Sequence, residues 1–371
     1  PMRTLLVTGA AGFIGANFVR MLLQRGEELN IVAFDKLTYA GNLANLEGFL
    51  SDPRLVFVRG DICDARLVAE TWEKHAISEV VHFAAESHVD RSILSSAAFV
   101  QTNVAGTQVL LDVARQRNVR RFLQVSTDEV YGSLPEDRPD LKFTEDTPLA
   151  PNSAYSASKA GADCLVRAAF HTFGMPVLIT RCSNNYGPYQ FPEKLIPLFV
   201  TNLIEGKKVP LYGDGLNVRD WLYVEDHCEA IWTVLNRGTP GQVYNIGANN
   251  ELTNRRITEV ILQAMGRSWD ESVQYVKDRP GHDRRYAIDA SKIQRELGWT
   301  PQRRFEHASA LTSDSRSPSR RHTTHLHLTH LTITAHPTAH RRGSALTCIH
   351  GGTVMMFRPR TCLLRLPHRQ E

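Results

Sequence analysis

The sequence predicts an α/β protein built on a doubly wound parallel sheet, with a smaller domain toward the C-terminus. Three observations support this prediction. Short apolar runs rich in β-branched residues alternate with helical apolar patterns in the first half of the chain. A glycine-rich turn joins the first of these runs to the first helical pattern, and polar motifs follow several later runs. Because ligands bind beyond the carboxyl ends of the strands in such sheets, we expect these motifs to share one edge.

Strand and helix patterns alternate regularly up to about residue 180. The predicted strands are Thr4–Thr8, Ile31–Phe34, Leu55–Val58, Glu79–Phe83, Arg121–Ser126 and Val177–Thr180. The predicted helices between them include Ile14–Gln24, Arg66–His75 and Ala105–Arg117. This order indicates a Rossmann domain over residues 1–180.

Residues 181–303 have a more mixed pattern, rich in Pro, Gly and Asn. The predicted elements here are the strands Val209–Tyr212 and Gln242–Ile246 and the helices Glu225–Leu235 and Arg256–Ala264. We interpret this stretch as the smaller, mainly substrate-binding domain, which closes over the site.

Residues 304–371 differ abruptly in composition from the rest of the chain. They hold nine of the fifteen histidines, together with clustered Thr, Ser and Arg, and no helical or alternating period is sustained. We expect a disordered tail without a built metal site. The tail also carries ten of the 43 basic residues but only three of the 39 acidic ones. The net charge of +4 therefore belongs to the tail, and it predicts no nucleic-acid partner for the mildly acidic remainder.

Composition narrows the class of protein further. Of the 371 residues, 42% are hydrophobic and 22% are charged, as in ordinary globular proteins. There is no run of eighteen apolar residues and no leader pattern before the first strand, so we expect neither a membrane partner nor secretion. The six cysteines form no CxxC pair, which favours a reducing, cytoplasmic location and no zinc site.

The glycine-rich turn runs from Thr8 to Gly15 with the sequence TGAAGFIG. Gly9 permits the tight turn, Gly12 lets backbone N–H groups approach a pyrophosphate, and Gly15 lets the helix pack close to the sheet. Asp35 lies twenty residues after Gly15, at the end of the second predicted strand. A carboxylate there suits the ribose hydroxyls of an adenosine and repels a 2′-phosphate, so we expect NAD.

Two residues near Asp35 leave alternatives open. Lys36 could favour the 2′-phosphate of NADP, so NADP stays open as the alternative cofactor. Asp61, which precedes Ile62 after the third predicted strand, could border the adenine or simply cap the next helix.

Tyr155 and Lys159 stand four residues apart on a predicted helix. This spacing puts both side chains on one helix face, where an ammonium favours the phenolate and lowers the pKa of the tyrosine toward that of a useful base. The alternative is an ordinary surface Tyr/Lys pair. The presence of the glycine-rich turn argues against it.

Thr127, Asp128 and Glu129 follow an apolar strand and are therefore expected at the ligand edge of the sheet. Thr127 can hydrogen-bond a sugar hydroxyl. If the two carboxyl groups differ in pKa, one can donate a proton and the other can accept one. Loss of water beside a ketone requires that pair of roles. A solvated acidic turn is the alternative for the dipeptide alone.

These motifs together resemble the extended short-chain dehydrogenases/reductases, and within them the dTDP-glucose 4,6-dehydratases, over about residues 3–303. The motifs that carry the resemblance are TGAAGFIG at 8–15, DKLTYAGN at 35–42, HFAAESHVDRS at 82–92, STDEVYG at 126–132, YSASKA at 155–160, RCSNNYGP at 181–188, PLYGDG at 210–215, RDWLYVEDH at 219–227 and DRPGHDRRYAID at 278–289. The Tyr–Lys pair marks only the superfamily, whereas the Thr-Asp-Glu triplet with SNNYGP is much narrower. The tail does not match.

The resemblance implies a lyase of deoxysugar biosynthesis that uses NAD to convert dTDP-glucose to dTDP-4-keto-6-deoxyglucose. Tyr155, assisted by Lys159, would remove the 4-hydroxyl proton while C4 gives a hydride to NAD, and Thr127 would hold that hydroxyl. Glu129 would take the C5 proton and Asp128 would protonate the leaving 6-hydroxyl. The hydride would then return to C6.

The resemblance also implies which residues line the two ligands. Those expected along NAD are Phe13, Ile14, Asp35, Lys36, Leu37, Thr38, Asp61, Ile62, Phe83, Ala84, Ala85, Ser87, Thr102, Tyr155, Lys159 and Asn185. Those expected along the sugar nucleotide are Ser87, Thr127, Asn184, Lys194, Leu195, Pro210, Leu211, Tyr212, Arg219, Asn254, Asp278, Arg279, Pro280, Gly281 and His282. Read without the resemblance, Arg219 is a surface ion pair, Asn184 and Asn185 form a turn, and His82 is a core residue.

Other functions on the same fold remain open. A UDP-sugar 4-epimerase or a UDP-glucuronate decarboxylase uses the Tyr–Lys pair and NAD but needs no relay through Asp128 and Glu129. A non-catalytic dinucleotide-sensing protein is a further alternative, which the intact tyrosine and lysine oppose. The resemblance implies a homodimer through the helices around 100–117 and 153–173.

Overall fold

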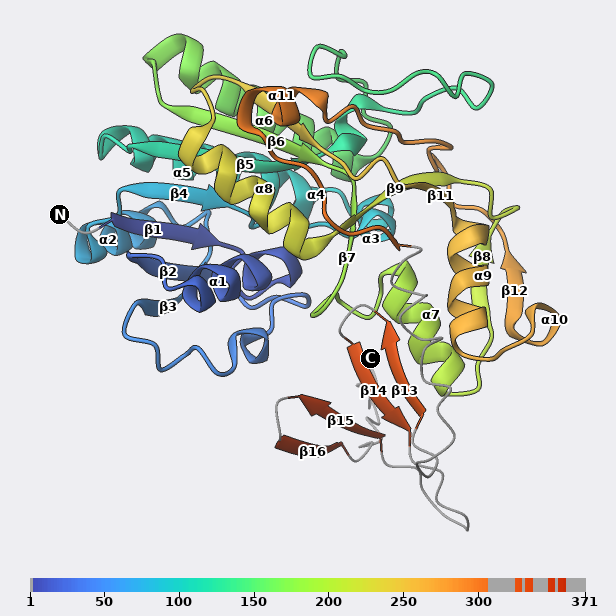
Figure 1. Cartoon of the computed structure of the whole chain (residues 1–371). Coiled ribbons are helices and arrows are strands. Elements are labelled where there is room, and N and C mark those ends of the chain that lie inside the picture. The colour runs from blue at the N-terminus through green and yellow to red at the C-terminus, as the bar shows by residue number, and fades with distance from the viewer. Residues whose placement is uncertain (1–2, 306–323, 329–330, 336–345, 351–352, 358–371) are drawn as a thin grey trace, which may run out of the picture. The chain divides into compact units, whose positions relative to one another are not determined.

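The computed structural model describes residues 3–305, 324–328, 331–335, 346–350 and 353–357 (Figure 1). The chain divides into two compact units, residues 1–307 and 308–371. The first unit holds the large sheet and two smaller ones. Among the described residues, no helix combines the length and apolar character needed to cross a membrane.

The large sheet has seven strands in the order β10-β6-β5-β4-β1-β2-β3, and every neighbouring pair is parallel. Its strands are β1 (Arg3–Thr8), β2 (Leu29–Asp35), β3 (Leu55–Arg59), β4 (Glu79–His82), β5 (Arg121–Thr127), β6 (Val177–Cys182) and β10 (Val243–Ile246). The order reverses direction at β1 and β4, which creates the crevice where such sheets bind ligands. All six strands predicted in the first 180 residues are present, and so is the predicted doubly wound parallel sheet.

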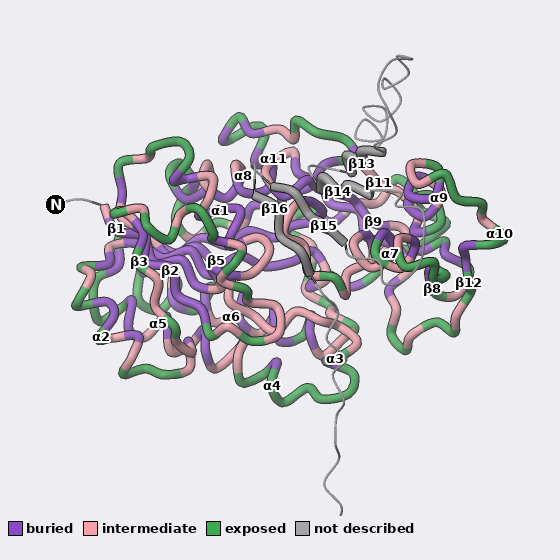
Figure 2. The backbone as a smooth tube through the Cα atoms, turned by 90° about the horizontal axis from the view of Figure 1, so that it is seen from below, coloured by how far each residue is buried: buried purple, intermediate pink, exposed green. Residues whose placement is uncertain are grey.

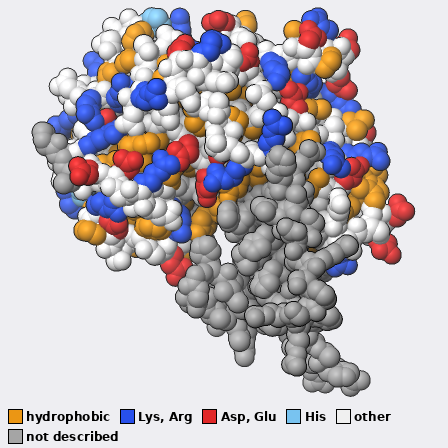
Figure 3. All heavy atoms as spheres, in the orientation of Figure 1, with side chains coloured by type: hydrophobic (Ala, Val, Ile, Leu, Met, Phe, Trp, Pro, Cys, Tyr) orange, Lys and Arg blue, Asp and Glu red, His pale blue; other side chains and the backbone are white. Residues whose placement is uncertain are grey.

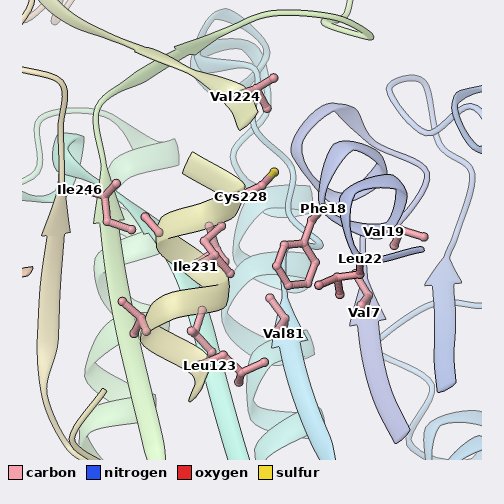
Figure 4. Close-up of a cluster of buried hydrophobic side chains, with 14 of the residues drawn as sticks. Val7, Phe18, Val19, Leu22, Val81, Leu123, Val224, Cys228, Ile231 and Ile246 are labelled. Atoms are coloured by element: carbon pink, nitrogen blue, oxygen red, sulfur yellow. The ribbon is translucent and has the colours of Figure 1, made fainter. Parts of the chain in front are cut away.

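Helices cover both faces of this sheet (Figure 1). One face carries α1 (Phe13–Arg25), α8 (Val224–Arg237) and α11 (Ser291–Leu297), whose buried side chains form one core with the sheet. Figure 4 shows Phe18 and Leu22 of α1 beside Ile231 of α8, above Val7 and Leu123 of the strands. The other face carries α2 (Ala65–His75), α5 (Gly106–Gln116) and α6 (Ala154–Phe173), which form a second core. Figure 2 shows the central strands β1, β2 and β5 buried between these layers.

Local sequence explains where the key helices begin and end. Gly26 ends α1 in the left-handed conformation, with φ at 68°, which glycine adopts without strain. Ser153 begins α6 through a capping box, in which its side chain and that of Ser156 each accept the other's backbone N–H. This cap fixes the first turn of α6 and therefore the direction of Tyr155.

The smaller part of the first unit is built on two short sheets. One has the order β11-β9-β7 and the other pairs β12 with β8. Its elements are β7 (Asn184–Tyr186), α7 (Leu195–Ile204), β8 (Val209–Tyr212), β9 (Val218–Tyr223), β11 (Glu251–Thr253), α9 (Asn254–Ala264), α10 (Trp269–Ser272) and β12 (Val273–Val276). Shorter helical turns elsewhere are η1 (Leu43–Leu46), α3 (Val89–Leu94), α4 (Ala97–Phe99), η2 (Val100–Ala105) and η3 (Asp128–Tyr131).

Residues after 180 contribute to both parts of the first unit. β10 adds a parallel strand beside β6, and α8 packs on α1. The chain therefore does not pass from one part to the other once, at residue 180. The division into residues 1–180 and 181–303 stays a prediction about ligand binding.

Asp226 anchors the end of the first unit. This buried carboxylate accepts hydrogen bonds from the backbone N–H groups of Gln302 and Arg303, at 2.9 and 2.8 Å, and pairs with the Arg303 guanidinium at 2.7 Å. Phe305 then packs edge-on against Tyr186 at 5.0 Å between ring centroids. The last described segment of the first unit is thus fixed by polar and aromatic contacts.

The second unit contains four described strands, β13 (Thr324–Leu328), β14 (Leu331–Ala335), β15 (Leu346–His350) and β16 (Thr353–Phe357). They form one antiparallel sheet in chain order. The other residues of the predicted tail lie outside the described ones, so the expectation of a disordered tail stays a prediction. Figure 3 shows that basic and acidic side chains are interspersed on one described face of the first unit.

Candidate active site

A deep cavity opens at the carboxyl ends of the parallel strands. The segments that follow β1, β2, β4, β5 and β6 all contribute to its walls. The glycine-rich turn lines one end, and Thr127, Asp128 and Glu129 line the other. The motifs found separately in the sequence therefore meet in one place, as the doubly wound topology requires.

The glycine-rich turn fits a dinucleotide closely. A Cβ on Gly9, where φ is 66°, would lie 2.7 Å from the Ala84 backbone nitrogen, and a Cβ on Gly15 would lie 2.2 Å from the Gly9 carbonyl oxygen. Within the described part of the chain, no side chain caps the N-terminus of α1, and its first turn carries no acidic residue. The backbone N–H groups of this turn and the positive end of the helix dipole are thus left for a phosphate.

Asp35 ends β2 and faces the same cavity. Its carboxylate accepts hydrogen bonds from the backbone N–H groups of Ala11 at 2.9 Å and Leu37 at 2.8 Å. Burial raises the pKa of Asp35, while these two bonds act in the opposite direction. Lys36 forms an ion pair with Asp61 at 2.6 Å, so its charge is already matched by a carboxylate.

Thr127 sets the position of the two candidate proton-transfer groups. β5 ends at this residue, and its hydroxyl accepts a hydrogen bond from the Glu129 backbone N–H at 3.3 Å. This bond caps the short helix η3, which begins at Asp128. The turn directs both acidic side chains into the cavity at the end of the sheet.

Asp128 and Glu129 stand in different electrostatic surroundings. Burial raises the pKa of Asp128 well above its usual value, and the negative charges of Glu129 and Asp220 raise it further. Burial also raises the pKa of Glu129, but the positive charges of Lys194, Arg219 and Arg279 counteract this. One oxygen of Asp128, Oδ2, is buried without a hydrogen-bond partner among the described residues. The charged neighbours of Asp128 therefore mainly raise its pKa, whereas those of Glu129 mainly lower it.

Tyr155 and Lys159 both line the cavity from α6. The Lys159 ammonium donates a hydrogen bond to the Val125 carbonyl oxygen at 2.8 Å. Burial raises the pKa of Tyr155 well above its usual value, and the negative charge of Glu129 raises it further. The expected lowering by Lys159 is therefore not found in the protein alone, because desolvation and the nearby carboxylates outweigh it.

A buried ion pair lies behind Lys159. Asp163 follows Lys159 by one helical turn, and its carboxylate accepts a hydrogen bond from the Arg181 Nε–H group at 2.9 Å. The side chains of Asp163 and Arg181 are only 1% and 7% exposed. Arg181 also donates to the Tyr131 hydroxyl at 3.0 Å, and Tyr131 donates to Asn245 at 2.8 Å.

Basic groups stand on the side of the cavity that Glu129 faces. Lys194 lines the cavity and donates to the Ser87 carbonyl oxygen at 3.3 Å. Arg219 on β9 is 5% exposed, lies over the Tyr286 ring at 4.2 Å and donates to the Asp283 carbonyl oxygen at 2.8 Å. Arg279 pairs with Asp90 at 3.1 Å.

The cavity gathers most, but not all, of the predicted site residues. The predicted residues that line it are Gly9, Gly12, Phe13, Ile14, Gly15, Asp35, Lys36, Thr38, Asp61, Ile62, Phe83, Ala84, Ala85, Ser87, Thr102, Thr127, Asp128, Glu129, Tyr155, Lys159, Asn184, Asn185 and Lys194. The predicted residues outside its lining are Leu37, Leu195, Pro210, Leu211, Tyr212, Arg219, Asn254, Asp278, Arg279, Pro280, Gly281 and His282. Several of these form a second cluster, in which His282 contacts both Asp278, at 2.6 Å, and the Tyr212 ring.

Sequence reasoning missed several residues of the cavity wall. Tyr39 and Cys182 lie inside motifs that were already quoted, so their neighbours could have pointed to them. Glu86 likewise lies inside the motif HFAAESHVDRS, whereas Gln190 and Phe191 carried no comparable signal, because nothing in their local pattern distinguishes them from ordinary loop residues.

The structure also decides between some of the open interpretations. Arg219 is buried rather than part of a surface ion pair. Asn184 and Asn185 begin strand β7 rather than forming a turn. His82 is a core residue, as expected, and its ring nitrogens contact the hydroxyls of Thr8 at 2.6 Å and Thr107 at 3.0 Å.

Comparisons with known proteins agree on one family. The family model described as GDP-mannose 4,6 dehydratase matches residues 6–312. A dTDP-glucose 4,6-dehydratase of Xanthomonas campestris pv. campestris (strain B100) is 53% identical over 330 residues, covering 84% of this chain and 93% of that protein. A dTDP-glucose 4,6-dehydratase from Streptomyces venezuelae, solved with NAD bound, superposes with a TM-score of 0.80 at 53% identity, covering 83% of this chain and 95% of that chain. A UDP-glucose 4-epimerase of Thermus thermophilus in complex with NAD superposes with a TM-score of 0.76, but at 30% identity, covering 84% of this chain and 98% of that chain.

Proposed function

The chain belongs to the GDP-mannose 4,6 dehydratase family, and from this premise we propose that it eliminates water from a nucleotide-linked hexose. It is an NAD-dependent lyase that converts dTDP-glucose to dTDP-4-keto-6-deoxyglucose, a step of deoxysugar biosynthesis. Relatives at 50–56% identity that carry this activity in their names support the thymidine nucleotide over a uridine one.

The observation that carries the proposal is the acidic pair at the end of β5. Asp128 and Glu129 line the same cavity as Tyr155 and Lys159. Oxidation at C4 needs only the tyrosine and the lysine, and a 4-epimerase needs no further proton-transfer pair because the hydride returns to C4. Elimination across C5 and C6 additionally needs one group that takes a proton and one that gives a proton. A buried and a half-buried carboxyl group supply those roles, because negative neighbours raise the pKa of Asp128 whereas positive neighbours lower that of Glu129.

The remaining groups have roles in holding and deprotonating the sugar. Tyr155 accepts the 4-hydroxyl proton, and the Thr127 hydroxyl holds that oxygen. Glu129 accepts the C5 proton, which the adjacent C4 ketone has made acidic, and Asp128 protonates the oxygen that leaves C6 as water. When C6 has received the hydride, the proton on Glu129 returns to C5. Lys159 stays bonded to the Val125 carbonyl and supplies positive charge beside the tyrosine.

The cavity suits NAD, as the glycine-rich turn and Asp35 indicate. When bound, NAD would supply the acceptor for the hydride from C4 and the donor of the hydride to C6, and the positive charge of its ring would favour the Tyr155 phenolate. The backbone N–H groups at the start of α1 would hold the pyrophosphate. Asp35 would hold the adenosine ribose and repel a 2′-phosphate. The Lys36–Asp61 pair leaves the lysine less able to favour NADP.

The diphosphate of the substrate is matched by Lys194, Arg219 and Arg279. All three act on Glu129 through their positive charges, and Lys194 lines the cavity. Guanidinium groups suit phosphate oxygens because they present paired donors. We propose that the second cluster, which contains Tyr212 and His282, receives the remainder of the nucleotide.

A Glu129→Gln variant tests the acidic pair. It removes the base for C5 but keeps the shape, so we expect dTDP-glucose still to reduce bound NAD while release of the 4-keto-6-deoxy product falls by at least about a hundredfold. A Tyr155→Phe variant serves as the matched control, because it should lose the oxidation itself. Turnover of a 4-epimer by Glu129→Gln at the wild-type rate would contradict the proposal and favour an epimerase.

Product analysis separates the nucleotide specificities and the sensor alternative. The wild-type protein with NAD is supplied with dTDP-glucose or UDP-glucose, and the products are identified by NMR. We expect a 4-keto-6-deoxy sugar mainly from the thymidine nucleotide. Binding of NAD without any sugar product would favour a non-catalytic dinucleotide-binding protein.

We further propose that the protein forms a homodimer through α5 and α6. Exposed small residues, Ala157 and Ala168, lie on the outer face of α6, where two copies of the helix could approach closely. Light scattering of wild type and Ala168→Glu would test this, because a buried charge should dissociate the pair. The four cysteines in the described part of the first unit are unpaired, which supports a cytoplasmic location.

A further inference from the structure

We propose that Asp220, a buried carboxylate on β9, keeps Asp128 protonated and so assigns to Asp128, rather than to Glu129, the role of proton donor. This inference rests on the proposed dehydratase function. It concerns a positioning residue, because Asp220 is not in the wall of the cavity and acts through Asp128.

The strand pairing puts Asp220 behind the acidic pair. β7 runs parallel to β9 with Asn184 opposite Trp221. Asp220 therefore lies beside Ser183, which lines the cavity. On the other side of this segment, Cys182 is paired with Thr127, the residue before Asp128. Residues 182–183 therefore lie between the two aspartates, and each aspartate is one strand spacing away from them.

Burial raises the pKa of Asp220, and the hydrogen bonds to its carboxylate act in the opposite direction. Its side chain accepts hydrogen bonds from the backbone N–H groups of Ala248 at 2.8 Å and Asn250 at 2.6 Å. Backbone donors stabilise the charged form of a carboxylate. A Cβ on Gly247 would lie 2.7 Å from Asp220 Oδ2, so the loop wraps tightly around the carboxylate. The negative charge is thus fixed in place and screened poorly from its neighbours, since Asp220 is only 1% exposed.

The groups that face Asp128 come from four elements. Glu129 belongs to its own turn, Asp220 and Arg219 come from β9, Tyr155 comes from α6 and Cys182 comes from β6. Arg219 is the cation in this set, and its guanidinium is occupied by the carbonyl oxygens of Val218 and Asp283. Burial raises the pKa of Asp128 well above its usual value, and the negative charges of Glu129 and Asp220 raise it further against the effect of this cation.

The free oxygen of Asp128 agrees with this assignment. Oδ2 is buried and has no hydrogen-bond partner in the described part of the protein, while Oδ1 accepts a long bond of 3.4 Å from Thr127. An ionised carboxylate in such a place would lack the donors that stabilise its charge. A protonated one carries an O–H group that can be given to the leaving oxygen of the sugar.

The test compares the pH dependence of the elimination step in wild type and in Asp220→Asn. Elimination should fall as pH rises through the pKa of Asp128, because the donor loses its proton. Removing the negative charge of Asp220 should move this falling limb of the pH–rate profile by about one pH unit to lower pH. At a given pH on the limb, the elimination rate should be roughly tenfold lower than in wild type. Single-turnover reduction of NAD by dTDP-glucose, which needs no proton from Asp128, should remain within about twofold of wild type.

Asp226→Asn is the matched control. Asp226 is equally buried and also accepts two backbone N–H bonds, but its partners are Gln302 and Arg303. The control should lose stability without moving the pH limb. An unmoved limb in a folded Asp220→Asn protein, or an equal movement in Asp226→Asn, would overturn the inference.

A second measurement does not depend on the folding of the Asp220 variant. The infrared spectrum of wild type at neutral pH should contain the carbonyl band of a buried protonated carboxyl group. That band should be absent from the spectrum of Asp128→Asn. Its persistence in Asp128→Asn, or its absence from wild type, would overturn the inference. If wild type formed no 4-keto sugar at all, the proposed function would fail instead, so the two failures are distinguishable.

Discussion

Removal of Asp163 should destabilise the protein strongly, although this residue does not line the cavity. In an Asp163→Leu variant the Arg181 guanidinium would stay buried at 7% exposure without its carboxylate partner. Breaking one side of a buried ion pair costs about 3–5 kcal/mol, because the remaining charge stays desolvated. The Tyr131 hydroxyl would remain as an acceptor for Arg181 at 3.0 Å, which favours the lower half of this range.

Denaturant unfolding measures this cost. Wild type, Asp163→Leu, Arg181→Met and the double variant are unfolded in guanidinium chloride at one fixed NAD concentration, because bound ligand shifts apparent stability. Tryptophan fluorescence and circular dichroism should give coincident transitions. The double variant should be more stable than the sum of the two single losses predicts, by roughly 2 kcal/mol or more. Strictly additive losses, or a cost below about 1 kcal/mol for Asp163→Leu, would refute the reasoning.

Three further predictions follow from the cofactor side and the core. Gly15→Ala should abolish NAD binding in calorimetric titrations, because the new Cβ would lie 2.2 Å from the Gly9 carbonyl oxygen; measurable binding at wild-type strength would contradict the tight turn. Asp35→Asn should weaken NAD binding by about tenfold and reduce the preference of the protein for NAD over NADP, as competition titrations would show. An unchanged preference would mean that Asp35 has no role in selecting between the two cofactors. Burial lowers the pKa of both His82 and His227 to about 3, so the unfolded chain binds more protons than the folded one below pH 6.5. The stability these neutral rings contribute is complete above pH 6.5 and is lost toward pH 3, by about 2 kcal/mol per histidine at pH 5; a His227→Gln variant should show a shallower dependence of the unfolding midpoint on pH.

Much of the fold could be predicted because its signals are local. The first strand, the glycine-rich turn and Asp35 lie within one short stretch, and each carries its meaning in its own neighbourhood. The Tyr155–Lys159 pair could likewise be read from helical spacing alone. The strands of the large sheet are buried on both faces, so they appear as continuous apolar runs that are hard to mistake.

The rest depends on contacts that spacing does not reveal. Asp163 and Arg181 are separated by 18 positions, and only the packing of α6 against β6 brings them together. Asp220 reaches the acidic pair through strand register, which no local pattern encodes. The expected effect of Lys159 on Tyr155 also required the structure, because burial depends on every element around the ring. The roles of the individual site residues stay predictions that the variants above can test.

The place of β10 in the large sheet has a consequence for synthesis of the protein. β6 is complete at Cys182, but its neighbour β10 begins only at Val243. While the intervening residues are being made, one edge of β6 is without its partner strand, and its apolar sequence is not yet covered by α8. Unpaired apolar edges invite association with other chains. The nascent protein should therefore pass through a stage that depends on chaperones, which ends when about 246 residues have emerged from the ribosome.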